Sequence, residues 1–329
     1  MATPNQPAPL GVPSSSAAAG SSNRPLVIQT EHLDAAAAAW LAERVELVKC
    51  ASEDEAFPAL LARASGLVIR TYTNVDEAML ARAPKLRVVG RAGVGLDNVD
   101  QEACLRRGVA VFNTPDANGT AVVEYVACLM LDALRPRVFL DKALPAAEWK
   151  KVRTGLLARR QLCQMTLGIW GLGKIGKRIA RLGAGLGMKV IYHDLLDIPP
   201  DQRHGAEPVS REQLCAGADI LTVHVDGRHE NTNLVSTDAF GRMKSDVVFI
   251  NTSRGFIVDP HATAEFMIAH PAATAMLDVH EPEPFGADYP LLDIANVHLS
   301  PHIAAATELA NTNMSWVVRD VWSVLEHQH

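Results

Sequence analysis

The glycine-rich segment at residues 171–176 constrains the fold more than any other part of the chain. It reads Gly171-Leu172-Gly173-Lys174-Ile175-Gly176, a G-x-G-x-x-G pattern, and lies between the apolar run Met165–Trp170 and the helical stretch Lys177–Leu186. In this context the first glycine permits a tight turn, the second lets the backbone approach a pyrophosphate, and the third lets helix and strand pack closely. The helix N-terminus then offers free N–H groups to the anion. The segment predicts a dinucleotide-binding unit of the Rossmann type.

A carboxylate follows at the distance that such a unit requires. The next apolar run, Lys189–His193, ends at Asp194, 18 residues after Gly176. An acidic residue at this position binds the ribose hydroxyls of the adenosine half. The residues after it, Leu195 to Asp197, include no arginine that could receive a 2′-phosphate. The sequence therefore favours NAD over NADP.

Short β-rich runs alternate with helical patterns over residues 24–115 and again over residues 165–300. Alternation of this kind predicts the α/β class, with two doubly wound parallel sheets in tandem. A helix from Asn118 to about Arg135 connects the two units, and residues 136–164 have an irregular pattern. The last helical stretch, Ala305–Glu326, is expected to pack back on the first unit. The expected domains are residues 25–117 with 301–329, and residues 118–300.

Composition limits the partners. The 329 residues carry a net charge of −6 without a basic block, so neither a nucleic-acid nor an anionic-membrane surface is expected. The five cysteines include no CxxC pair, which predicts no metal site and no disulfide framework and favours the reducing cytoplasm. No run approaches the ~20 apolar residues of a membrane span. Residues 1–24, rich in Ala, Ser and Pro, are expected to form a disordered leader.

Three charged or titratable side chains follow predicted strands of the second unit. Arg254 comes after the run Val247–Asn251, Glu283 lies five residues after Asp278 at the end of another run, and His302 follows a third. Ligands bind at the carboxyl ends of strands in open α/β sheets. A guanidinium fork suits a substrate carboxylate, and a histidine beside a carboxylate suits proton transfer near neutral pH. We predict that Arg254, Glu283 and His302 are catalytic for a 2-oxo or 2-hydroxy acid.

Several segments together resemble one family, the D-isomer-specific 2-hydroxyacid dehydrogenases. The resemblance spans nearly all of residues 25–329 and is carried by segments in the family's order: Val88–Asp100, Asn113–Pro115, Leu167–Gly176, Asn251–Asp259, Leu277–Pro284 and Ser300–Ala304. In motif pattern it is similar to phosphoglycerate dehydrogenases and hydroxypyruvate or glyoxylate reductases that lack a regulatory domain. It implies a flavodoxin-like substrate domain and a Rossmann domain with a cleft between them.

The resemblance also implies roles for individual residues. Arg254 would bind the substrate, Glu283 would orient His302, and His302 would exchange the proton with the substrate oxygen. The remaining implied contacts are the backbone of Val94 and Gly95 with the substrate carboxylate, Lys174 and Ile175 with the pyrophosphate, and Thr252, Ser253 and Asp278 near the nicotinamide. Residues 136–164 would form an arm for a homodimer.

The substrate stays open at this point. Arg70 and Arg91 match positions that phosphoglycerate dehydrogenases use for an anionic tail, which suggests 3-phosphoglycerate and phosphohydroxypyruvate. Tyr72 replaces a small residue, and its ring would favour a compact acid such as glyoxylate or hydroxypyruvate. A surface or interdomain ion pair is the alternative for Arg70 and Arg91.

The sequence departs from the family pattern at two places, and two alternative functions stay open. The family's usual His-x-Pro-Leu is replaced by residues 224–227, and Arg159-Arg160 replaces a common Glu-Leu pair. The first makes the loop over the adenine side harder to predict, and the second has no functional explanation in the sequence. One alternative is a non-catalytic NAD-sensing scaffold like the carboxy-terminal-binding corepressors, which retain the same trio. The other is formate oxidation, but Pro301 stands where a glutamine is expected before His302.

Overall fold

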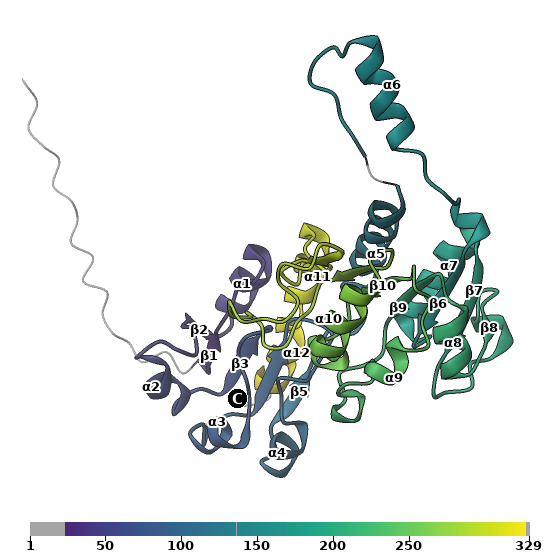
Figure 1. Cartoon of the computed structure of the whole chain (residues 1–329). Coiled ribbons are helices and arrows are strands. Elements are labelled where there is room, and N and C mark those ends of the chain that lie inside the picture. The colour runs from purple at the N-terminus through teal and green to yellow at the C-terminus, as the bar shows by residue number, and fades with distance from the viewer. Residues whose placement is uncertain (1–23, 136, 327–329) are drawn as a thin grey trace, which may run out of the picture.

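Short apolar runs form two separate sheets in which every strand pair is parallel (Figure 1). The computed structural model describes residues 24–135 and 137–326. The predicted leader lies outside the described residues except for Arg24. Two parallel-sheet α/β domains confirm the predicted fold class. None of the helices in these two ranges has both the length and the apolar composition of a membrane span.

The first sheet has the strand order β2-β1-β3-β4-β5, which is the flavodoxin-like order. Its strands are β1 (Leu26–Gln29), β2 (Glu46–Lys49), β3 (Gly66–Ile69), β4 (Val88–Arg91) and β5 (Ala110–Phe112). The helices that alternate with them are α1 (Ala35–Ala42), α2 (Phe57–Leu61), α3 (Glu77–Ala81) and α4 (Gln101–Arg106). Side chains of α2, α3 and α4 fill the core on one face, and α1 covers the other. Strands β1, β3 and β4 are buried throughout, as expected for a sheet covered on both sides.

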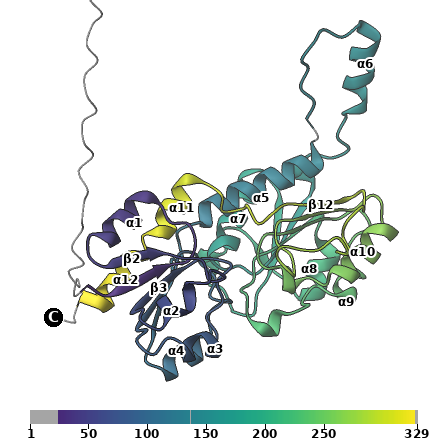
Figure 2. The same cartoon turned by 90° about the vertical axis from the view of Figure 1, so that its left-hand side faces the viewer.

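The C-terminal segment returns to this first sheet, as Figures 1 and 2 show in yellow. Helices α11 (Glu308–Ser315) and α12 (Val318–Leu325) pack with α1, and α12 lies on β3 and β4. The approach is close, because a Cβ on Gly90 would lie 2.4 Å from Val321. The single helix predicted for this segment is wrong: it starts later and is broken near residue 316. The Ser315 hydroxyl donates to the Asn311 carbonyl at 2.7 Å, a local bond that competes with the regular helix pattern.

The second sheet has seven strands in the order β12-β11-β10-β9-β6-β7-β8, the Rossmann order with one strand added. The strands are β6 (Thr166–Trp170), β7 (Lys189–His193), β8 (Glu207–Pro208), β9 (Ile220–Val223), β10 (Val248–Asn251), β11 (Thr274–Leu277) and β12 (Val297–Leu299). The helices are α5 (Gly119–Leu134), α7 (Lys174–Gly185), α8 (Arg211–Gly217), α9 (Thr237–Phe240) and α10 (Pro260–Ala269). Short 3₁₀ turns occur at Leu162–Gln164, Pro200–Gln202, His229–Asn231 and Gly255–Ile257.

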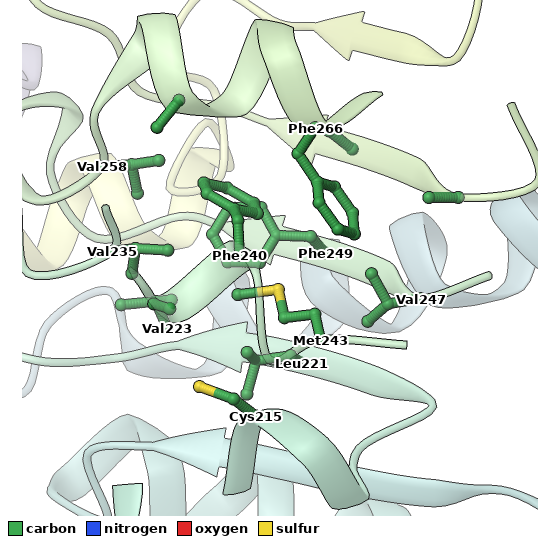
Figure 3. Close-up of a cluster of buried hydrophobic side chains, with 14 of the residues drawn as sticks. Cys215, Leu221, Val223, Val235, Phe240, Met243, Val247, Phe249, Val258 and Phe266 are labelled. Carbon is green, nitrogen blue, oxygen red and sulfur yellow. The ribbon is translucent and has the colours of Figure 1, made fainter. Parts of the chain in front are cut away.

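Side chains of the central strands alternate between two cores. Phe249 of β10 points into the core formed with α8, α9 and α10, where its ring centroid lies 5.3 Å from that of Phe240 in an edge-to-face contact (Figure 3). Its neighbours Val248 and Ile250 belong to the opposite core, formed with α5 and α7. This alternation is the period-two pattern of a strand buried on both faces. The sheet therefore gives rigid support to the loops at the carboxyl ends of its strands.

Residues 137–164 leave the body of the molecule and carry helix α6 (Ala146–Gly155), which projects away from both domains (Figures 1 and 2). The irregular structure predicted here is therefore wrong in part. No residue of α6 is buried, and Phe139 and Trp149 are 85% and 54% exposed. A helix without a buried face has no apolar periodicity, so no pattern in the sequence indicates it.

The arginine pair at 159–160 has a structural explanation. Arg160 donates to the buried carboxylate of Asp219 at 2.8 Å and to Asp246 at 3.2 Å. Asp219 also accepts from Lys244 at 2.9 Å and from the N–H of Thr166 at 2.7 Å. Arg160 thus fastens the segment before β6 to the amino-terminal side of the second sheet.

Candidate active site

The glycine loop leaves an open helix N-terminus at the end of β6. Gly171 has φ of +96°, and a Cβ there would lie 2.7 Å from the His224 carbonyl oxygen. A Cβ on Gly176 would lie 2.1 Å from the carbonyl oxygen of Gly171. At Gly173, which precedes α7, nothing lies within 4 Å of an added Cβ. The loop is therefore tightly packed at its first and third glycines and open at the second, which fits a pyrophosphate against the helix N-terminus.

Helix α7 begins three residues earlier than predicted, so Lys174 and Ile175 lie in its first turn. The Lys174 ammonium lies 3.0 Å from a carboxylate oxygen of Asp116, in the connection between the two domains. Asp194 follows β7 and accepts from the N–H of Leu172 at 2.6 Å and from that of Leu196 at 2.9 Å. The carboxylate predicted to bind ribose is thus held beside the glycine loop.

The turn that carries Arg254 is fixed by the side chain before it. Asn251, at the end of β10, donates to the Arg254 carbonyl at 2.9 Å and accepts from both the N–H and the hydroxyl of Ser253 at 3.0 Å. Thr252 is buried, and its hydroxyl has no hydrogen-bond partner within residues 24–135 and 137–326. An unpartnered buried hydroxyl is available to a bound group, so this turn also fits the cofactor.

Arg254 reaches the first domain. Its Nε and Nη2 both lie 2.9 Å from Oδ1 of Asp97, in the loop after β4. Burial raises the pKa of Asp97, but the hydrogen bond and the charge of Arg254 outweigh burial and hold this pKa below its ordinary value. A Cβ on Gly95 would lie 1.7 Å from Nη2 of Arg254. The loop predicted to bind the substrate carboxylate through Val94 and Gly95 is thus in contact with Arg254.

Glu283 and His302 form the predicted pair. Nδ1 of His302 lies 2.8 Å from Oε2 of Glu283, and Oε1 of Glu283 accepts from the N–H of His280 at 2.7 Å. Burial raises the pKa of Glu283, and the hydrogen bonds from His302 and His280 lower it to a net value below the ordinary one. Glu283 therefore stays ionised at neutral pH and accepts hydrogen bonds through both of its oxygens.

The backbone of His302 is strained and is held by Asp278. His302 has φ of +54°, a left-handed conformation that is costly for a residue with a side chain. Its N–H donates to the Asp278 carbonyl at 2.8 Å, and the fully buried Asp278 carboxylate accepts from Ile303 N–H at 2.9 Å and Ala304 N–H at 2.8 Å. Asp278 thus orients the loop that carries His302.

The remaining substrate candidates lie in the first domain. Arg91 is only 8% exposed, and its Nε has no hydrogen-bond partner in the described part of the chain. Burial, and next the charge of Arg254, lower the pKa of Arg91 to about 10. Arg70 instead donates to the side chain of Asn311 in α11 and to the His32 carbonyl. The Tyr72 side chain is 70% exposed, so its ring lies at the surface.

Comparison with known proteins identifies the family. Residues 127–304, more than half of the chain, match the family model described as D-isomer specific 2-hydroxyacid dehydrogenase, NAD binding domain. The chain belongs to this family. A glyoxylate reductase from Aeropyrum pernix is 36% identical over 252 residues, 75% of this chain and 75% of the relative. A D-3-phosphoglycerate dehydrogenase from Archaeoglobus fulgidus is 35% identical over 256 residues, 77% of this chain and 48% of the relative.

The chain thus spans about half the length of the curated phosphoglycerate dehydrogenases that it matches. Among solved structures, an NADPH-dependent glyoxylate/hydroxypyruvate reductase from Sinorhizobium meliloti, in complex with NADP and malonate, aligns with a TM-score of 0.78 and 28% identity. The alignment covers 93% of this chain and 94% of that one. The family membership predicted from the motifs is confirmed.

Two residues that shape the site, Asp97 and Glu31, are not indicated by the sequence pattern. Asp97 lies within a segment that carried the resemblance, but nothing local indicates that it meets Arg254. Glu31 was also missed: its carboxylate accepts from the N–H groups of residues 70–73 and so fixes the loop that carries Arg70 and Tyr72. Both are loop residues whose partners come from other loops, and the period of strands and helices carries no information on such contacts.

Proposed function

We propose that the protein is an NAD-dependent dehydrogenase that transfers hydride reversibly between NADH and the C2 carbonyl of a small 2-oxoacid. The observation that carries the proposal is the Glu283–His302 pair. Because Nδ1 of His302 faces the carboxylate at 2.8 Å, Nε2 is the nitrogen available to a substrate oxygen. Family membership and the open glycine loop support the nicotinamide cofactor.

The side chains divide the work of the reaction. The bound nicotinamide supplies the hydride in reduction and accepts it in oxidation. In reduction, protonated His302 donates the Nε2 proton to the substrate oxygen, and in oxidation the neutral imidazole takes it back. Glu283 stabilises the charged imidazole in both directions. Arg254 and the N–H groups of Val94 and Gly95 bind the substrate carboxylate and hold the carbonyl in place.

The charges near Arg91 favour a singly charged acid of the glyoxylate or hydroxypyruvate type. Arg70 and Arg254 lower the pKa of Arg91, whereas Asp97 and Glu31 raise it, so all four lie within electrostatic range. Three guanidinium groups and two carboxylates leave about one positive charge. A phosphorylated 2-oxoacid carries more negative charge than this balance neutralises. It is the second candidate, because the family resemblance places Arg70 and Arg91 at positions that bind an anionic tail.

The test is NADH oxidation over a panel of 2-oxoacids: glyoxylate, hydroxypyruvate, phosphohydroxypyruvate, pyruvate and oxaloacetate. Preference for glyoxylate or hydroxypyruvate is expected. Preference for phosphohydroxypyruvate would assign Arg70 and Arg91 to the phosphate and select the second candidate. If none of the acids is reduced while NADH binds tightly, the protein is not a dehydrogenase of this class.

The choice of NAD over NADP rests on Asp194. A carboxylate beside the adenosine ribose repels a 2′-phosphate, so the protein should prefer NADH. The Asp194→Ala variant should lose most of this preference, measured as the ratio of kcat/KM with NADH to that with NADPH. A wild-type protein that already prefers NADPH, as the Sinorhizobium meliloti reductase solved with NADP does by its description, would contradict this assignment.

Residues 136–164 are proposed as the contact of a homodimer. Phe139 and Leu157 are 85% and 84% exposed, and apolar side chains on a projecting arm are typical of a covered surface. Phe139→Asp should shift the protein from dimer to monomer in size-exclusion chromatography with light scattering. Leu105→Asp is the matched control, because Leu105 is 81% exposed but lies on α4. A wild-type monomer would refute the proposal.

A reducing compartment such as the cytoplasm is proposed as the place of action. All five cysteines are unpaired, and Cys50, Cys104 and Cys215 are buried. Free thiols persist where glutathione keeps them reduced. Cell fractionation that finds the protein in an oxidising compartment would contradict this proposal.

A further inference from the structure

Asp97 and Arg254 join the loop after β4 to the turn after β10, although they lie 157 residues apart in the chain. The Nε and Nη2 atoms of Arg254 lie 2.9 Å from Oδ1 of Asp97, and Nη1 donates to the Ser253 carbonyl at 2.6 Å. Nε therefore donates to an acceptor of the first domain and Nη1 to an acceptor of the second. The orientation of the group is set by contacts at both of its ends.

Two glycines, one from each domain, enclose the pair. A Cβ on Gly95 would lie 1.7 Å from Nη2 of Arg254 and 2.5 Å from Oδ1 of Asp97. A Cβ on Gly227 would lie 3.2 Å from Oδ1 of Asp97 and 3.4 Å from Cγ of Arg254. The Arg254 and Asp97 side chains are only 22% and 27% exposed. Their attraction is therefore screened less than that of a surface ion pair.

The Asp97 carboxylate also offsets the repulsion between two positive charges, those of Arg254 and Arg91. Arg91 is buried, and the charge of Arg254 acts on it unfavourably, while the charge of Asp97 acts favourably. Removing the carboxylate would leave two guanidinium groups that repel one another. It would also allow the Arg254 side chain to adopt more rotamers. Binding of a substrate carboxylate would then include the cost of orienting Arg254.

We propose that Asp97 is a positioning residue, which holds Arg254 across the domain boundary in the orientation that receives the carboxylate of the 2-oxoacid. The inference rests on the proposed function. Asp97 itself does not exchange the proton or the hydride. Its main effect on substrate binding is transmitted through Arg254, which distinguishes it from a residue that merely stabilises the first domain.

The test is a double-mutant cycle of Asp97→Asn and Arg254→Lys in the full chain with NADH. Asp97→Asn should raise KM for the preferred 2-oxoacid by about 10–100-fold, the range for losing one hydrogen bond to a charged group, with a smaller fall in kcat. In the Arg254→Lys background, the same substitution should change KM little, because an ammonium has replaced the guanidinium fork that Asp97 orients. The dissociation constant of NADH should not change.

Glu102→Gln is the matched control, since Glu102 is an exposed carboxylate on α4 that pairs only loosely with Arg106, at 3.9 Å. It should match the wild type. Equal effects of Asp97→Asn with and without Arg254, or a KM like that of the control, would overturn the proposal. If Asp97→Asn does not fold, Asp97→Glu keeps the charge and moves it by one methylene, and it should show the same KM effect to a smaller extent.

Failure of the proposed function gives a different result. A wild-type protein that reduces no 2-oxoacid would refute the dehydrogenase assignment without testing Asp97. Oxamate, an unreactive amide analogue of a 2-oxoacid, then serves as the probe, and its binding to the NADH complex is measured by calorimetry. Weaker oxamate binding in Asp97→Asn than in Glu102→Gln would support the positioning role, and equal binding would overturn it.

Discussion

Replacing Glu283 with glutamine is a sharp test of the proposed proton transfer. Both carboxylate oxygens accept hydrogen bonds: Oε2 from Nδ1 of His302 at 2.8 Å and Oε1 from the N–H of His280 at 2.7 Å. A glutamine has one oxygen and one NH₂ group, so in either orientation an NH₂ group faces one of these two donors. Losing a hydrogen bond to a charged group costs about 1.5–3 kcal/mol, and an unsatisfied donor adds about 1–3 kcal/mol.

Because the pair is only half-buried, the expected loss of transition-state stabilisation lies in the lower part of the combined range, at about 3–4 kcal/mol. This corresponds to a fall of about 10²–10³-fold in kcat/KM for reduction. Affinity for NADH should stay near that of the wild type.

The assay is NADH consumption with the preferred 2-oxoacid, with NADH affinity measured by fluorescence titration. Glu281→Gln is the control, since Glu281 is an exposed carboxylate two residues away in the same loop. A Glu283→Gln variant that matches Glu281→Gln in rate would refute the proton-transfer role of the pair. A variant that has also lost NADH affinity would show damage to the fold instead.

Arg254→Lys should raise KM for 2-oxoacids and lower kcat, because a point charge cannot reproduce the guanidinium fork; unchanged kinetics would place Arg254 outside the site. Gly173→Ala should fold normally, since nothing lies within 4 Å of an added Cβ, and should weaken NADH binding, measured by fluorescence titration. Gly176→Ala should not fold, since its Cβ would lie 2.1 Å from a carbonyl oxygen. Equal behaviour of the two variants would contradict this. Arg160→Ala should lower the free energy of unfolding in urea by about 1–2 kcal/mol, because the buried Asp219 carboxylate loses a hydrogen bond from a charged donor. A change within error of zero would refute the stabilising role of Arg160. Burial raises the pKa of Asp219, but hydrogen bonds to its carboxylate hold the net pKa below the ordinary value. The ionised carboxylate therefore stabilises the fold above the unfolded pKa of ~3.9, and this stabilisation is lost as the pH falls through the pKa of the folded state. The free energy of unfolding of Asp219→Asn should accordingly depend less on pH in the acid range than that of the wild type.

The sequence predicted the parts of the site that depend on local pattern. Strands buried on both faces appear as short apolar runs, so the ends of β10, β11 and β12 could be located. Because β11 pairs with both β10 and β12, the loops that follow them meet at one edge of the sheet. The meeting of Glu283 and His302 therefore followed from strand order within a single sheet.

Contacts between the domains could not be predicted in this way. The Asp97–Arg254 pair joins loops of different sheets, and its formation depends on how the two domains pack. The helix α6 was missed because it buries no face. The break near residue 316 lies beside a serine hydroxyl that bonds within its own helix. Each of these features is set by a partner or an exposure that periodicity does not encode.

The two pairs at the site differ in what holds them. Glu283 and His302 both lie in the second domain, where Asp278 fixes the strained backbone of His302, so this pair persists whatever the position of the first domain. Arg254 and Asp97 lie in different domains, so any movement that opens the boundary between the domains separates them. The proposed proton donor is therefore held within one domain, whereas the orientation of the arginine proposed to bind the carboxylate depends on how the two domains meet.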